Sequence, residues 1–151
     1  MAATVHASAV LIGARAVLIR GPSGAGKSRL ALELIDAARA GRLRLARLVG
    51  DDRVHLQSAG GRLLVRPAAT LAGLIEMRGR GILRFDYEPC AVVGLVVDLD
   101  AADAQRLPEQ QDIEIEGIII PRLAVAPGTA ALPRVLALLT LTRAAIDRDV
   151  R

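Results

Sequence analysis

A glycine-rich segment over residues 21–28 carries the clearest chemical signal in the sequence. It reads GPSGAGKS and matches the pattern G-x-x-x-x-G-K-[ST] at every fixed position, between an apolar stretch and a helical pattern. In such a loop, backbone N–H groups and the positive end of the following helix dipole converge on phosphate oxygens. The lysine reaches the β- and γ-phosphates, and the serine hydroxyl ligates Mg²⁺. The segment therefore predicts a site for ATP or a similar polyphosphate rather than a chance glycine turn. The predicted site, called the phosphate loop below, consists of Gly21, Pro22, Ser23, Gly24, Ala25, Gly26, Lys27 and Ser28.

The lysine of this loop is unusual in its context. Of the 20 lysine and arginine residues in the chain, only Lys27 is a lysine. A GC-rich coding bias explains the excess of arginine and the many alanines. Lysine is a compact point charge, whereas arginine is a planar fork. The single lysine thus indicates a position at which arginine does not serve.

Two adjacent acidic residues, Asp51 and Asp52, follow the apolar run LARLVG. A P-loop enzyme needs a group that holds the metal and a group that orients or deprotonates the nucleophile. Adjacent residues on a strand point to opposite faces, so the two carboxylates have different tasks unless the strand has already ended. One would face the phosphates as a base, and the other would meet water, a metal or a cation. The alternative interpretation is an ordinary acidic turn.

Two further features are weaker when taken alone. His6 lies in an expected strand, where a single histidine is more often a surface or hydrogen-bonded core residue. The stretch IEMRGRGIL contains Glu76, Arg78 and Arg80 among glycines and between apolar flanks. By composition alone, this stretch is equally compatible with a solvated loop.

Periodicity predicts the elements that position these residues. Alternating and continuous apolar runs indicate strands, apolar residues three and four apart indicate helices, and Gly13 and Gly41 fit a turn and a helix end. We expect strands over 4–12, 15–20, 45–50 and 91–100, a hairpin around 58–61, and helices over 27–40 and 133–148. We further expect a short helix within 68–75, a strand over 113–125 interrupted at Gly117 and Pro121, and a mobile surface loop over 103–112. The predicted fold class is α/β, a single P-loop domain with a mixed sheet and few helices.

Composition bounds the class of protein. The chain has 151 residues, 52% of them apolar, and a net charge of +4. A lone cysteine, Cys90, excludes an internal disulfide and indicates a reducing, cytoplasmic compartment. The arginines are dispersed and aromatic residues are scarce, so we expect no nucleic-acid partner. The sequence also lacks a membrane-spanning run and the charged start of a signal peptide.

Taken together, the motifs resemble the catalytic domain of the bacterial HPr kinase/phosphorylase family. The resemblance rests, in order, on a histidine before the phosphate loop, GPSGAGKS running into RLALELI, LVGDDRV, and LIEMRGRGIL. A weaker match is IIIPRLAVAPG before the last helix. The resemblance covers nearly the whole chain. It implies a fold related to phosphoenolpyruvate carboxykinases and ATP-dependent phosphorylation of a serine on the phosphocarrier protein HPr.

The resemblance also implies a role for each matching residue. Lys27 would stabilise the transferred phosphoryl group, and Ser28 and Glu76 would bind Mg²⁺. The acidic pair would supply the base, with His6 beside it. We favour Asp51 as the base, although the two roles could be exchanged. Arg106 falls near a functional arginine of the family. The signature loop corresponds to Glu76, Arg78, Gly79 and Gly81.

The chain departs from longer family members in extent. We expect a single P-loop kinase catalytic domain over residues 1–151 without an N-terminal regulatory domain, resembling the short alpha-proteobacterial forms. Pro127-Gly128 is followed by Thr129-Ala130, where many members carry Arg-Asn, and the C-terminal region is short. Because the family's phosphorylase activity and part of its hexamer depend on that region, we expect kinase activity, doubt the phosphorylase and leave a homo-oligomer open. The alternatives are a P-loop small-molecule kinase or ATPase, and a nucleotide-binding regulatory module without turnover.

Overall fold

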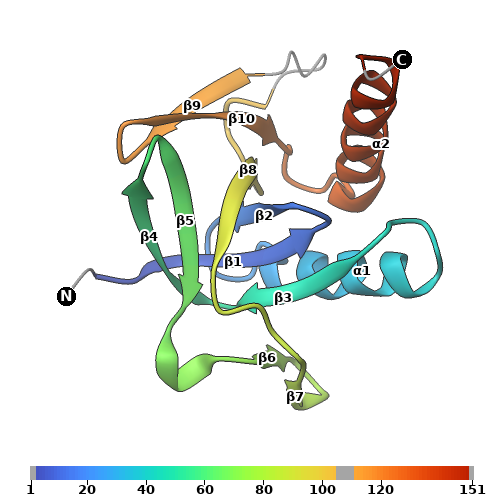
Figure 1. The fold of residues 1–151 in the computed structure, drawn as a ribbon. Coiled ribbons are helices and arrows are strands. Elements are labelled where there is room, and N and C mark those ends of the chain that lie inside the picture. Colours follow the sequence, from blue (N-terminus) through green and yellow to red (C-terminus); the bar gives the residue numbers. More distant parts are fainter. Residues whose placement is uncertain (1–2, 105–110, 150–151) are drawn as a thin grey trace.

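The computed structural model describes residues 3–104 and 111–149 (Figure 1). Its helices are α1 (Lys27–Arg39), α2 (Ala131–Asp149) and the short 3-10 helix η1 (Ala69–Leu71). The strands of the first half are β1 (Val5–Ile12), β2 (Arg15–Arg20), β3 (Ala46–Gly50), β4 (Arg53–Ala59) and β5 (Arg62–Pro67). The strands of the second half are β6 (Leu74–Met77), β7 (Gly81–Arg84), β8 (Ala91–Asp98), β9 (Gln111–Ile115) and β10 (Ile118–Ala124). The expectation of a mixed α/β fold with few helices is confirmed.

In the curled main sheet, β1 and β8 each pair with three other strands. Its path runs β2-β1-β4-β5-β8-β10-β9, β3 pairs with β1, and β2 also pairs with β8. The pairing of β2 with β8 closes a ring of five strands. Both β2–β8 and β8–β10 are parallel, whereas the other pairs are antiparallel. The ring brings the carboxyl ends of β2 and β8 side by side, at the point where the phosphate loop leaves β2.

Two apolar cores hold this arrangement together. Alternate residues of β2 face different cores: Val17 and Ile19 pack toward the helices, whereas Ala16 and Leu18 pack between the curled parts of the sheet. This is the period of two expected for a strand buried on both faces. The first core takes in buried residues of α1 and of the start of α2. Helix α1 therefore has a fixed position against the sheet, and with it the loop that precedes α1.

Most predicted elements are observed, with differences at three places. Within 68–75 only η1 is helical, and the chain enters β6 at Leu74. Gly117 does separate β9 from β10, but the predicted interruption at Pro121 is wrong. Pro121 lies inside β10 opposite Asp112, and the pairing of β10 with β8 begins one residue later, at Arg122. A proline without an N–H is tolerated where no ladder bond from it is required. Of the predicted loop 103–112, residues 111 and 112 belong to β9, and residues 105–110 lie outside the described part of the chain.

None of the helices in the described ranges has an apolar stretch long enough to cross a membrane.

Candidate active site

The phosphate loop connects the end of β2 to the start of α1, as the motif predicts. Gly26 has φ 101°, a left-handed conformation that glycine adopts at little cost. Its carbonyl accepts the N–H of Leu30 at 2.9 Å, so the first turn of α1 begins directly at the loop. The unpaired N–H groups of this first turn and the helix dipole are thereby directed at the loop. The geometry suits an anion, and α1 is long enough, at 13 residues, to have a substantial dipole.

Lys27 is held within the curve of this loop. Its side chain is buried, with 6% of the residue exposed. The ammonium Nζ donates hydrogen bonds to the carbonyl oxygens of Gly21, at 2.8 Å, and Pro22, at 3.1 Å. A buried ammonium on two carbonyl groups costs desolvation free energy that two neutral acceptors offset only in part. An anionic phosphate would be a stronger partner for the same group.

Ser28 and Asp51 form the second contact of the loop. The Ser28 hydroxyl lies 2.8 and 2.9 Å from the two carboxylate oxygens of Asp51. Asp51 follows the last residue of β3 and is 4% exposed. The acidic pair is therefore not an ordinary solvated turn, because one member is buried against the motif's serine.

Ser8, which the sequence analysis did not single out, links the two acidic residues. It lies on β1 and is fully buried. Its hydroxyl donates to the Asp51 carboxylate at 2.6 Å and accepts the backbone N–H of Asp52 at 3.3 Å. The available signal was a hydroxyl residue inside the otherwise apolar run from Ala7 to Ile12. A buried hydroxyl needs a partner, and this one has two.

Asp52 points away from its neighbour and meets His6. The Asp52 carboxylate lies 2.7 Å from Nε2 of His6, and the side chains are 59% and 42% exposed, respectively. Asp52 has φ 67°, and its carbonyl accepts the N–H of Ala7 at 3.1 Å. Strand β3 has already ended at Gly50, so strand alternation does not separate the two carboxylates. The backbone conformation of Asp52, unusual for a non-glycine residue, turns them in different directions instead. This geometry differs from the assignment we expected: the buried Asp51 contacts Ser28 of the phosphate loop, whereas Asp52 faces solvent beside His6.

The signature stretch forms a separate hairpin of β6 and β7. Ile75 of β6 is fully buried in the core that contains α1, so Glu76 points to the opposite, exposed face. Gly79 and Gly81 have φ 80° and 79°, a backbone conformation that would be strained for any residue with a Cβ atom. Arg78 is exposed in this turn. The stretch is therefore an ordered β-hairpin and not an irregular loop.

The structure does not join every predicted site residue. Within residues 3–104 and 111–149, no hydrogen bond or ion pair connects Glu76 to Ser28 or Asp51, and no cluster of three or more His, Cys, Asp or Glu side chains could hold a metal ion. Arg106 lies outside the described residues. The pairs that are brought together are Ser28 with Asp51 and His6 with Asp52, bridged by Ser8.

The donor set at the loop nevertheless fits Mg²⁺. This ion prefers oxygen ligands and is usually bound through one or two side chains together with substrate phosphates and water. Ser28 and Asp51 supply a hydroxyl and a carboxylate that already face each other beside the phosphate loop. A three-residue cluster is not required for this kind of site.

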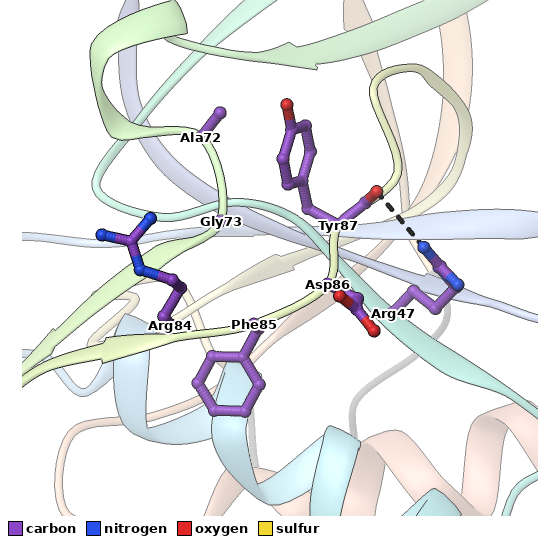
Figure 2. Close-up of a pocket in the computed structure, with 7 residues that line it drawn as sticks. All are labelled: Arg47, Ala72, Gly73, Arg84, Phe85, Asp86 and Tyr87. Carbon is purple, nitrogen blue, oxygen red and sulfur yellow. Dashed lines mark hydrogen bonds between the residues drawn. The ribbon is translucent and has the colours of Figure 1, made fainter.

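A hollow of about 500 Å³ lies away from these residues (Figure 2). It is lined by Arg47, Ala72, Gly73, Arg84, Phe85, Asp86 and Tyr87. Arg47 lies 3.2 Å from the Glu88 carboxylate and donates a long hydrogen bond, 3.4 Å, to the Tyr87 carbonyl. Figure 2 shows the rings of Phe85 and Tyr87 pointing away from each other. None of the predicted site residues lines this hollow, so its size does not decide where the chemistry occurs.

A phosphate loop between a strand and a helix, with a buried carboxylate on its serine, is typical of proteins that bind nucleoside triphosphates. The family model described as "HPr Serine kinase C-terminal domain" matches residues 1–128. The chain belongs to this family of HPr kinase C-terminal domains.

Individual relatives agree with the family assignment. The chain is 35% identical over 139 residues to an HPr kinase/phosphorylase of Streptococcus thermophilus, a match that covers 83% of this chain and 43% of that protein. For the HPr kinase/phosphorylase of Limosilactobacillus reuteri the identity is 36%, with 83% and 41% covered. The chain therefore spans less than half the length of these curated relatives. The solved structure of the HPr(Ser) kinase/phosphatase from Coxiella burnetii superposes with a TM-score of 0.77 at 26% identity, over 96% of this chain and 99% of that one.

Proposed function

We propose that this chain is the catalytic domain of an ATP-dependent protein-serine kinase that phosphorylates HPr. Family membership and the activities for which the relatives are named support this substrate. The observation that carries the proposal is the hydrogen-bonded series from Ser28 through Asp51 and Ser8 to Asp52 and His6. It connects the phosphate loop to an exposed carboxylate, and a phosphoryl-transfer enzyme requires both.

ATP would bind with its phosphates in the loop, where Lys27 exchanges two carbonyl partners for phosphate oxygens. Ser28 and Asp51 would hold Mg²⁺, which neutralises charge on the phosphates when it is bound. Glu76 remains a proposed additional ligand, on the strength of the signature alone. Phosphoryl transfer depends mostly on positioning and on charge neutralisation, and these residues supply both.

Asp52 is the residue we propose as proton acceptor. A serine hydroxyl is a poor nucleophile, and a carboxylate within hydrogen-bond reach can accept its proton as the phosphoryl group is transferred. The Asp52 carboxylate is exposed enough to meet a protein substrate, and His6 holds one of its oxygens at 2.7 Å. Asp51 is less suited to this task because it is buried and already bonded to two hydroxyl groups. The same acid could protonate a serine oxygen in the reverse direction.

The proposal places the reaction in the cytoplasm, where ATP is present and the unpaired Cys90 remains reduced. It includes HPr as the protein partner and no nucleic acid or membrane.

A phosphotransfer assay with γ-labelled ATP, Mg²⁺ and HPr tests this function. We expect label on HPr with the wild-type chain and none with Lys27→Ala. A small-molecule kinase or an ATPase would instead consume ATP without labelling HPr. A regulatory module would bind ATP without turnover.

A further inference from the structure

A buried carboxylate at the end of β8 binds two arginines next to the phosphate loop. Asp98 is 9% exposed. Its two oxygens accept hydrogen bonds from Nε and a terminal nitrogen of Arg20, at 2.7 and 2.8 Å. One of these oxygens also accepts Nε–H of Arg122, at 2.5 Å. The contact with Arg20 is bidentate, which fixes the orientation as well as the position of the guanidinium group.

Arg20 is the residue directly before the loop. It ends β2, and Gly21 follows it. The carbonyl of Arg20 accepts the N–H of Leu99 at 2.8 Å, so both its side chain and its main chain are tied to the end of β8. A Cβ atom on Gly21 would lie 3.1 Å from both Cβ and the carbonyl oxygen of Leu99. The first loop residue is therefore packed closely against the residue that follows Asp98.

The residue directly after Arg20, Gly21, binds the lysine of the loop. The carbonyl oxygen of Gly21 is the nearer of the two acceptors for Nζ of Lys27, at 2.8 Å. The direction of that carbonyl depends on the backbone of Arg20, whose side chain Asp98 holds. We propose that Asp98 is a positioning residue that fixes the start of the phosphate loop through Arg20, and thereby sets the affinity for nucleoside triphosphate. This inference rests on the proposed function only in assuming that the loop binds ATP.

The two arginines do not depend equally on Asp98. Arg122 also binds Asp103, at 2.9 and 3.1 Å, and Gln111, at 3.0 Å. Among the described residues, the Arg20 side chain has Asp98 as its only hydrogen-bond partner. Loss of the Asp98 charge therefore leaves Arg122 partly satisfied, whereas Arg20 is left partly buried without a counter-ion. Because an unpaired buried charge is costly, Arg20 would move toward solvent and take the loop with it.

The electrostatics agree with this geometry. Burial alone raises the pKa of Asp98, but the hydrogen bonds and positive charges of Arg20 and Arg122 outweigh it and hold the pKa below its ordinary value. The carboxylate is thus ionised at neutral pH, as a bidentate contact with Arg20 requires.

The test compares the affinity for a fluorescent ATP analogue with thermal stability. We expect Asp98→Asn to weaken binding by about tenfold at a temperature at which the variant is fully folded, because a small misplacement of binding groups has large effects. Asp98→Glu restores the charge and should recover part of the affinity. Glu88→Gln is the matched control: it removes the carboxylate of the Arg47 ion pair, 3.2 Å long, without touching the loop, and should leave the affinity unchanged.

Other outcomes would overturn the inference. If Asp98→Asn lowered the melting temperature but bound the analogue like the wild type, Asp98 would be a structural residue only. Should Asp98→Asn fail to fold, Arg20→Lys keeps the charge but loses the bidentate contact, and unchanged binding by that variant would contradict the inference. Because the readout is nucleotide affinity, a wild-type chain that binds the analogue but does not label HPr would refute the proposed function and leave this comparison intact.

Discussion

The hydroxyl of Ser28 lies 2.8 and 2.9 Å from the two carboxylate oxygens of Asp51. The two residues belong to separate elements, because Ser28 is in the first turn of α1 and Asp51 follows β3. This contact buries the Asp51 carboxylate at the phosphate loop and leaves the Asp52 carboxylate exposed. In the proposed function, Asp52 is therefore the carboxylate that meets the substrate.

The lysine of the loop gives the first prediction. Lys27→Ala should lower phosphotransfer by about 100-fold or more, because a preorganised positive group at the transferring phosphates is lost. Lys27→Arg should not restore phosphotransfer, because the planar guanidinium group does not fit the place of the ammonium group between the Gly21 and Pro22 carbonyl oxygens. Initial rates with γ-labelled ATP measure this effect. Arg29→Ala removes a positive charge from the exposed side of the same helix and serves as the control. An active Lys27→Ala enzyme would refute the role of the loop.

The two aspartates should fail in different ways. Asp52→Asn should reduce kcat by about 100- to 10,000-fold, the usual range for a general base, and leave the Mg²⁺ requirement unchanged. Asp51→Asn should raise the Mg²⁺ concentration needed for half-maximal activity, because it weakens the oxygen donor set at Ser28. Mg²⁺ titrations of both variants separate the two roles. The reverse pattern would restore our original assignment of Asp51 as the base.

The divergence of these two carboxylates shows where prediction from sequence reaches its limit. The place of the phosphate loop between a strand and a helix was predicted correctly because the motif consists of eight consecutive residues. The directions of Asp51 and Asp52 depend instead on Ser8, which is 43 positions from Asp51 and becomes its neighbour only when β1 pairs beside β3. The sequence-based rule that adjacent strand residues point to opposite faces could not assign the roles.

The same limit applies at the other end of the loop. Asp98 was part of a predicted buried strand, and nothing local connected it to Arg20, 78 residues earlier. Their contact follows from the parallel pairing of β2 with β8, which places Arg20 opposite Asp98. The apolar pattern of a segment predicts that it is a strand, but the order of the strands in the sheet depends on the whole chain.

Ser8 is predicted to matter through the residues it orients. Ser8→Ala should lower kcat by about tenfold, the usual effect of losing a residue that orients a metal ligand. The lost hydrogen bonds should also lower the free energy of unfolding by about 1 kcal/mol. The substitution should also raise the Mg²⁺ requirement, because Asp51 loses one of its two hydroxyl partners. Ser58→Ala, at an exposed position of β4, is the control. Ser8→Ala with wild-type kcat and Mg²⁺ dependence would show that Ser8 merely fills space.

Stability should depend on pH through Asp98. Its pKa in the folded state lies below the ordinary value of an unfolded aspartate, which is about 3.9. The carboxylate therefore contributes its full stabilisation above about pH 4, and this contribution is lost as the pH falls through the folded-state pKa. Urea unfolding at a series of pH values should show a flatter decline below pH 4 for Asp98→Asn than for the wild type. Equal declines would mean that the two arginines do not stabilise the ionised carboxylate.

Glu76 provides a test of the signature hairpin. Glu76→Gln should raise the Mg²⁺ requirement if this exposed carboxylate completes the metal site. The measurement is a Mg²⁺ titration of phosphotransfer, with Glu114→Gln on β9 as a control for loss of one exposed negative charge. An unchanged Mg²⁺ dependence would remove Glu76 from the ligand set and leave Ser28 and Asp51 as the residues that hold the ion.

The most direct test of the central claim is a single-turnover transfer from γ-labelled ATP to HPr, followed by mass-spectrometric mapping of the labelled residue. The wild-type chain and Asp52→Asn are compared under identical Mg²⁺ conditions, with ATP binding measured in parallel. We predict label on a serine of HPr for the wild type, with transfer by Asp52→Asn slowed at least about 100-fold despite normal ATP binding. ATP binding by the wild type without any label on HPr would contradict the claim that this chain is an HPr serine kinase.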